Sequence, residues 1–179
     1  HLERMRGDIV AMGNAPAVIE AMRQFSAAFA ACGASADTQL QQFYDTDVQA
    51  AGSNPGVDLQ HASGNACRNG YAQAHAENDG FFRKRHATYG WYDMLLVDSK
   101  GNVVYSLRKD NDFATNLLNG PWKDTGLARV AAIALNRTVS GVPAFSDAEH
   151  YPAMGNRPAM FLAIPVLEPG SGRPLGALA

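Results

Sequence analysis

The stretch from Lys109 to Gly126, KDNDFATNLLNGPWKDTG, gathers side chains that could bind a small molecule. It mixes carboxylates, amides and lysines with apolar anchors, namely Lys109, Asp110, Asn111, Asp112, Asn116, Asn119, Trp122, Lys123 and Asp124. Pockets for small molecules combine an apolar wall with a few donors and acceptors that fix the ligand's orientation. The same composition is typical of a turn-rich connection in which Asp and Asn side chains satisfy the backbone. Both interpretations stay open on these residues alone.

A second stretch, AFSDAEHYPAMGNRP, has the same mixed character and contributes Phe145, Asp147, Tyr151 and Arg157. Like the first stretch, it could contribute side chains to a small-molecule pocket.

Signatures of catalysis and metal binding are absent from the sequence. It contains no GxSxG, HExxH, Walker A, GxGxxG or EF-hand motif. The histidines are dispersed, and the eleven positions from His75 to His86 span about three helical turns, too far for two ligands of one ion. The sequence therefore indicates neither an enzyme nor a metal or cofactor site.

The 179 residues suit one domain, with or without a helical extension. A net charge of -2, from 15 basic and 17 acidic residues, argues against nucleic acid or an anionic membrane surface as a partner. No run of about 18 apolar residues occurs. The final RPLGALA is typical of a strand that has just begun, so we expect this chain to come from a longer protein, and we read His1 and Leu2 as remnants of a tag.

Two cysteines, Cys32 and Cys67, match none of the zinc or haem spacings. In an oxidising compartment they could form one disulfide, and elsewhere they are two unrelated thiols.

Apolar residues recur at helical spacing over residues 3–50, with a break at Asn14 and Pro16. We expect Asn14 to cap the segment after the break and Asp37 to cap a further helix. Gly52–Gly64 is predicted to be a loop because it is rich in Gly, Asn, Ser and Pro. Helix is expected to return at about Arg68.

After this helix the period of the pattern changes to that of strands. WYDMLLV and VVYSLRK predict a hairpin with Gly101 in its turn. A short helical turn over 113–119, a helix from about 125 to 135, and strands at 143–147, at 159–166 and from Leu175 are expected to follow. Strands paired through hairpins, with helices to one side, predict an α+β fold with an antiparallel sheet.

At these residues the chain resembles a known family. GWYDMLLVDSKGNVVYSLRKDNDFATNLLNGPWKDTGLARV, AFSDAEHYPAM and PAMFLAIPVLEPGSGRPLGALA are similar to the Cache or PAS-like extracytoplasmic sensor domains of bacterial transmembrane receptors. YAQAHAENDGFFRKRHATYGWYD looks like the helix that leads into such a sensor in methyl-accepting chemotaxis proteins and related kinases and cyclases. The resemblance covers residues 68–179 well and the preceding helices more loosely.

The resemblance implies a helical region over residues 1–67 and a PAS-like Cache sensor domain with a five-stranded antiparallel sheet over residues 68–179. It also implies membrane spans on either side of this fragment and a periplasmic location as part of an inner-membrane protein of a Gram-negative bacterium. A Cys32–Cys67 disulfide is chemically permissible there.

The chain departs from the family pattern at Trp91 and Trp122, where tyrosine is more frequent, and at Thr125, which replaces serine. Gly52–Gly64 matches no feature of the family.

The leading hypothesis is a sensory module in which a small solute, such as an amino acid, amine or small carboxylate, binds between the sheet and the loops at 109–124 and 145–157. We expect the pocket to contain Tyr105, Lys109, Asp112, Trp122, Phe145 and Asp147. In this hypothesis Asp112 and Asp147 receive an ammonium group and Lys109 receives a carboxylate. The alternative is a module that forms homodimers or acts as a spacer and has no ligand of its own, or a module that recognises a separate binding protein. It would use the helical seam of Val18, Met22, Phe25 and Phe29.

Overall fold

The computed structural model describes residues 2–48 and 65–179, apart from the side chains of residues 46–48, so the expected loop at Gly52–Gly64 lies outside the described residues. The helical part comprises α1 (Leu2–Gly13), α2 (Pro16–Ala31), the 3-10 turn η1 (Gly33–Ser35), α3 (Ala36–Gln42), the π-helical turn η2 (Phe43–Val48) and α5 (Ala66–Tyr89). The remainder comprises β1 (Leu95–Asp98), β2 (Val103–Ser106), α6 (Gly126–Leu135), β3 (Ala144–Phe145), β4 (Glu149–Tyr151), the 3-10 turn η4 (Pro152–Met154), β5 (Arg157–Ala159), β6 (Leu162–Leu167) and β7 (Pro174–Leu178).

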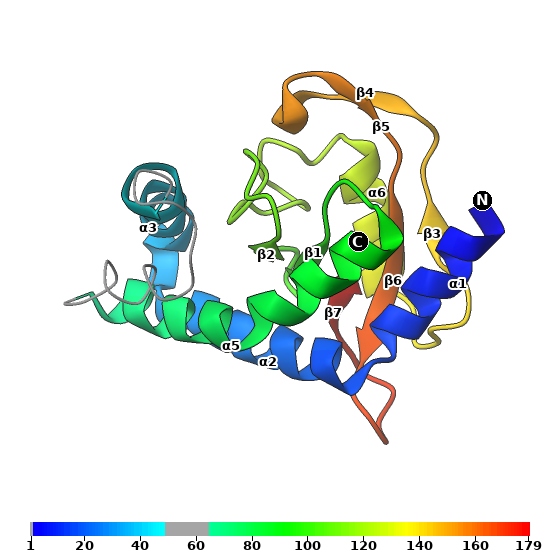
Figure 1. Cartoon of the computed structure of the whole chain (residues 1–179), viewed down its shortest axis with the longest axis horizontal. Helices are drawn as coiled ribbons and strands as arrows, with labels where there is room; N and C mark the ends of the chain where they lie inside the picture. The colour runs from blue at the N-terminus through cyan, green and yellow to red at the C-terminus, as the bar shows by residue number, and fades with distance from the viewer. Residues whose placement is uncertain (1, 49–64) are drawn as a thin grey trace.

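The main sheet has five strands in the order β2-β1-β7-β6-β3, and every neighbouring pair is antiparallel. The predicted α+β class with a five-stranded antiparallel sheet is therefore confirmed. Strand β7 lies at the centre, between β1 and β6. Strands β4 and β5 form a separate two-stranded hairpin, which projects at the top of Figure 1.

Both faces of the sheet are buried, and alternate residues of each strand point to opposite faces. Leu96, Val104 and Ile164 belong to the core shared with α1, α2 and α5. Leu95, Val97 and Ala163 belong to a second core against α6. The N-terminal helices and α6 therefore cover opposite faces of the same sheet.

Helices α2 and α5 run side by side in Figure 1, and α1 lies beside β6. The close approach of α2 to the sheet depends on Gly176 in β7. A Cβ atom there would lie 2.6 Å from the Met22 Cε and 2.3 Å from the Val97 carbonyl oxygen. The helices before residue 67 thus share a core with the sheet, while the division of the chain at that residue stays a prediction.

A disulfide joins Cys32 at the end of α2 to Cys67 in the first turn of α5. The sequence left this pairing open, and the structure settles it. The bridge fastens the two long helices at one end, so it closes a loop of 35 positions around α3 and η2.

Two expected helix caps are wrong. The residue that caps α2 is Ala15, whose extended backbone (φ -70°, ψ 130°) is the conformation favoured before proline. Asn14 instead donates from Nδ2 to the carbonyl oxygen of Val10, so it ends α1. Helix α3 is preceded by Ser35, which places Asp37 inside its first turn.

The predicted hairpin of β1 and β2 is present, and Gly101 in its turn has φ 89° as expected. Helix α5 begins at Ala66, within two residues of the expected start. The stretch 113–119 forms turns and one isolated bridge, between Asn102 and Asn116, in place of the expected helical turn.

Reducing the disulfide should lower the free energy of unfolding by about 3 to 4 kcal/mol, because the unfolded chain regains the entropy of a loop of this length. Urea unfolding with and without dithiothreitol measures the difference. The Cys32→Ser/Cys67→Ser double variant is the control and should not respond to the reductant. Equal stability of the native chain in both conditions would contradict the expectation.

Candidate functional site

A cavity of about 340 Å³, which we call the Asp112 pocket, is the main candidate site. Its volume falls within the range of small-molecule sites. Five parts of the chain line it. They are α1 with Met5 and Ile9, the end of α5 and the residues that follow it (Tyr89–Asp93), the loop after β2 with Asp110 and Asp112, the region from Tyr151 through Met154 to Leu162, and Leu95 with its hydrogen-bonded neighbour Ala179.

The loop that carries Asp112 folds back along β2. The Val103 N–H donates to the Thr115 carbonyl oxygen (2.8 Å), and the Ala114 N–H donates to the Val103 carbonyl oxygen (3.0 Å). Lys109 and Ala114 adopt positive φ angles of 56° and 63°, and these two residues reverse the chain at either end of the loop. Because the loop folds back in this way, Asp112 is buried and only 3% of its surface is exposed.

Asp112 is incompletely paired for a buried carboxyl group. Its Oδ2 accepts a hydrogen bond from the Tyr151 hydroxyl (2.8 Å), whereas its Oδ1 has no partner among the described residues. Burial raises the pKa of Asp112 to about 7, and the nearby charges of Asp93 and Asp110 act in the same direction against the Tyr151 hydrogen bond. A buried oxygen of this kind is expected to find a donor from a ligand or from water.

Asp93, in contrast, is saturated with hydrogen bonds. Its Oδ1 accepts from the backbone N–H groups of Met94 (2.6 Å), Leu107 (2.9 Å) and Arg108 (3.2 Å), and its Oδ2 accepts from the Ser106 hydroxyl (2.7 Å). These bonds tie the segment before β1 to the end of β2. They also explain why β1 begins at Leu95 and not at Trp91, because the Asp93 side chain takes up backbone N–H groups that pairing between strands would otherwise use.

Tyr92 connects three of the segments around the pocket. Its hydroxyl donates to Asp110 Oδ2 (3.0 Å) and accepts from Arg157 Nη2 (2.5 Å) in β5. The guanidinium groups of Arg108 and Arg157 lie 4.2 Å and 5.0 Å from the centre of the Tyr92 ring, within the range of cation–π contacts.

Aromatic rings form much of the remaining wall. Tyr151 packs edge-on against Phe161 (4.8 Å between ring centres), and Trp91 stacks against Tyr89 (4.7 Å). The indole N–H of Trp91 is buried and donates to no partner in the described part of the chain. The described residues that line the pocket therefore include two buried polar atoms without a partner, an acceptor on Asp112 and a donor on Trp91.

The six predicted pocket residues lie in different places. Asp112 lines the pocket. Trp122 packs against Tyr151 (6.4 Å between ring centres) and donates to the Asn111 carbonyl oxygen, so it supports the wall without lining the cavity. Phe145 and Asp147 are exposed and line none of the described cavities.

Tyr105 and Lys109 belong to a buried polar cluster, the Asp79 network, between α5 and β2. Asp79 is fully buried and accepts from the Tyr105 hydroxyl (2.9 Å) and from Arg83, and His75 Nε2 lies 3.2 Å from its Oδ1. Lys109 Nζ lies 3.0 Å from His75 Nε2. Burial by itself would raise the pKa of Asp79, but His75 and the Lys109 charge hold it well below its usual range.

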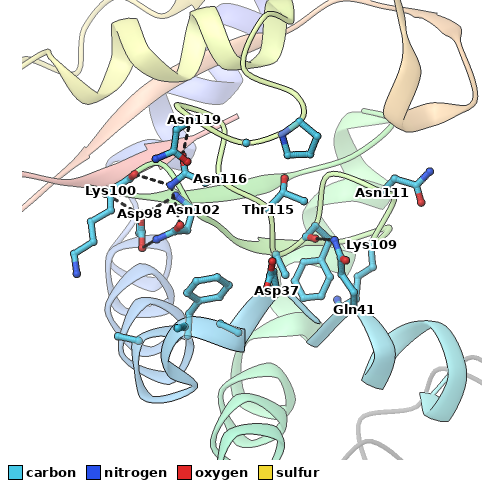
Figure 2. A pocket seen from close by; sticks show the side chains of 18 of the residues that line it. Asp37, Gln41, Asp98, Lys100, Asn102, Lys109, Asn111, Thr115, Asn116 and Asn119 are labelled. Carbon is cyan, nitrogen blue, oxygen red and sulfur yellow. Dashed lines mark hydrogen bonds between the residues drawn. The ribbon is translucent and has the colours of Figure 1, made fainter. Parts of the chain in front are cut away.

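A larger, more polar cavity of about 820 Å³ lies beside the β1–β2 turn and α3 (Figure 2). Many of its polar side chains already bond to one another or to the backbone. Asn116 donates to Asn102 (2.9 Å), Asn102 donates to Asp98 (2.8 Å), and Gln41 donates to the Phe113 carbonyl oxygen (2.8 Å). These side chains hold the turns around the cavity, which is the turn-stabilising interpretation that the sequence had left open.

Sequence reasoning expected alternate residues of the strand YDMLLV to face the pocket, but it named none of Trp91–Asp93 among the six pocket residues. The available signal was the run of aromatic and acidic residues, WYD, at the end of a long helix. The contribution of Met5 and Ile9 carried no signal, since they have the spacing of an ordinary apolar helix face.

Comparisons with family models, with curated proteins and with solved structures found no match to this chain. Within residues 2–48 and 65–179, no helix has the length and apolar character to cross a membrane. The same residues contain no group of three or more His, Cys, Asp or Glu side chains arranged to hold a metal ion.

The raised pKa of Asp112 should make stability depend on pH. Between about pH 4 and pH 7 the folded state holds a proton on Asp112 that the unfolded chain releases, so stability falls as the pH rises through this window. Above about pH 7 the folded state carries the cost of a buried charge on Asp112, and Asp112→Asn removes that cost. The unfolding free energy of the variant minus that of the native chain should therefore be a few kcal/mol larger at pH 8.5 than at pH 4.5. Urea unfolding at both pH values measures this. The exposed Asp147→Asn variant is the control, and an equal gain at both pH values would contradict the assignment.

Tyr105→Phe should lower the free energy of unfolding by about 1.5 to 3 kcal/mol, because buried Asp79 loses a charge-assisted hydrogen bond. Tyr89→Phe is the matched control, since no hydrogen bond of its hydroxyl is described, and it should change stability by less than about 0.5 kcal/mol. Thermal and urea unfolding compare the two variants. If Tyr105→Phe costs no more than Tyr89→Phe, the Asp79 network does not stabilise the fold.

Proposed function

We propose that this chain is the extracytoplasmic ligand-sensing domain of a bacterial transmembrane signalling receptor of the Cache or PAS-like kind. In this proposal a small solute binds in the Asp112 pocket, and the change is transmitted through the helices to a cytoplasmic output domain. The chain would then belong to the periplasmic part of an inner-membrane protein.

The observation that carries the proposal is the cavity itself, with a buried carboxyl group that keeps one oxygen unpaired. Leaving a buried acceptor unpaired is unfavourable, so its retention favours a role in binding. Among the described residues that line the pocket there is no serine, threonine, cysteine, histidine or lysine, and these residues supply most of the nucleophiles of enzymes. This composition favours binding over catalysis.

Three further features support a sensor. The antiparallel five-stranded sheet with preceding long helices is the architecture that the resemblance implies. The disulfide is typical of proteins in oxidising compartments such as the periplasm. The pocket is lined by Met5 and Ile9, so a ligand would contact the N-terminal helix directly.

The alternative of a dimerising or spacer module receives less support. The seam of Val18, Met22, Phe25 and Phe29 is buried against the chain's own sheet and α5, which leaves it unavailable to a partner helix.

A thermal-shift screen of this chain against amines, amino acids, small carboxylates and neutral solutes tests the proposal. A solute present at a hundred times its dissociation constant should add about 2.7 kcal/mol, which is a shift of several degrees. The shift should be lost in Asp112→Asn, measured against that variant's own midpoint. It should persist in Asp37→Asn, whose exposed carboxylate lines the other cavity.

A flat screen of well-folded protein would count against a direct solute sensor. Sedimentation across concentrations would then ask whether the chain is a dimerising module.

A further inference from the structure

We infer that the ligand of the Asp112 pocket is a small primary amine with an apolar body and without a carboxylate. The inference rests on the proposed function and narrows the class of solute that this site would take. It is carried by three features of the described pocket: the charges of its lining, the donor that Asp112 lacks, and the aromatic wall.

The charged side chains that line the described pocket are all acidic. Asp93, Asp110 and Asp112 all line the cavity, whereas no lysine, arginine or histidine does so among the described residues. Arg108 and Arg157 approach Tyr92, but neither contributes to the lining. A cavity walled by carboxylates and apolar groups attracts a cation more strongly than water-exposed carboxylates would.

Of the three carboxylates, Asp112 is the one that has a buried oxygen without a partner among the described residues. Asp93 is saturated by three backbone N–H groups and the Ser106 hydroxyl. Asp110 already accepts from the Tyr92 hydroxyl. Asp112 keeps Oδ1 unpaired and buried, and its partner Tyr151 holds the other oxygen in place.

The unpaired Oδ1 requires an N–H or O–H donor, and this requirement selects the type of cation. A primary ammonium group supplies three donors together with a full charge. A quaternary ammonium group has no N–H and would leave the oxygen unpaired. A neutral alcohol can donate, but it leaves the three carboxylates without a counter-charge.

The remaining wall suits the apolar part of such an amine. Trp91, Tyr92, Tyr151 and Phe161 present aromatic rings, and Met5, Met154 and Met160 add thioether side chains that adapt to irregular shapes. Aromatic faces also attract a cation, which reinforces the selection. A body of aromatic or branched aliphatic carbon atoms therefore fits the lining better than a polar one.

A carboxylate on the ligand would work against binding. An amino acid would place its own negative charge among Asp93, Asp110 and Asp112, and the described lining residues include no basic side chain to receive it. The unpaired Trp91 N–H is a single neutral donor and cannot offset three carboxylates. Amines should therefore bind more tightly than the amino acids from which they differ by one carboxylate.

Protons should compete with the amine for Asp112. The groups that face this carboxyl are the Tyr151 hydroxyl, Asp93 and Asp110, with Glu149 acting on Tyr151 and the two arginines acting on Tyr92. Because the pKa of Asp112 is about 7, an increasing fraction of the sites is neutral below this pH. Affinity for an amine should fall about tenfold per pH unit in that range, while affinity for a neutral probe should not change.

Titration calorimetry of this chain at pH 8 with a matched set of probes tests the inference. The set is 2-phenylethylamine, 2-phenylethanol, phenylacetate and phenylalanine, with isopentylamine, isopentanol, isovalerate and leucine as the aliphatic series. In at least one series the amine should bind about tenfold or more tightly than its three counterparts. Asp112→Asn should remove this preference and its pH dependence, and Asp147→Asn, which deletes the same charge on the exposed surface, should retain both.

The outcomes separate this inference from the function on which it rests. Tighter binding of a carboxylate, an amino acid or an alcohol than of the amine would overturn the inference and leave the sensor function standing. Amine binding that survives unchanged in Asp112→Asn would also overturn it. Failure of every probe here and in the broader thermal-shift screen would instead count against the proposed function itself.

Discussion

The five-stranded sheet is apolar on both faces, and the need to cover both faces determines where nearly every other element lies. Helices α1, α2 and α5 cover one face and α6 covers the other. Strand β7 is at the centre of this arrangement, where Gly176 lets α2 pack directly on the sheet. The Asp112 pocket lies where these helical layers end. There α1, the loops after α5 and β2, and the β4–β5 hairpin meet and leave a cavity between them.

Polar contacts join the loops around the pocket to one another. Asp93 replaces ladder bonds at the start of β1, Tyr92 joins Asp110 to Arg157, and Tyr151 reaches Asp112 across 39 positions of the sequence. Such bonds are directional, so they fix the loops in one geometry. Among the described residues that line the pocket, these bonds leave one buried acceptor, Asp112 Oδ1, and one buried donor, the Trp91 N–H, without a partner.

Sequence reasoning reached the elements whose signals are local. The apolar runs in LLVD and VVYS predicted the β1–β2 hairpin, which lies at one edge of the sheet, and Gly101 marked its turn because a positive φ favours glycine there. Asp112 was found because it lies in a stretch dense in polar and aromatic residues.

The predictions that failed depended on competing interactions. Pro16 set the backbone of Ala15 and displaced Asn14 from its expected cap, and the Asp93 hydrogen bonds shortened β1. The contribution of α1 to the pocket is a tertiary contact, which periodicity cannot show.

The same packing suggests which helix would respond to a ligand. Helix α2 is held by its packing on α5, by Gly176 beneath it and by the disulfide at its end. Helix α1 is separated from it by the break at Asn14–Pro16, and of these two helices only α1 lines the pocket, through Met5 and Ile9. A ligand shifts an equilibrium only through contacts that differ between two states, so it must touch the part that moves. In the proposed sensor, a ligand in the Asp112 pocket would contact α1 directly, and α2 is tied to α5 by the disulfide.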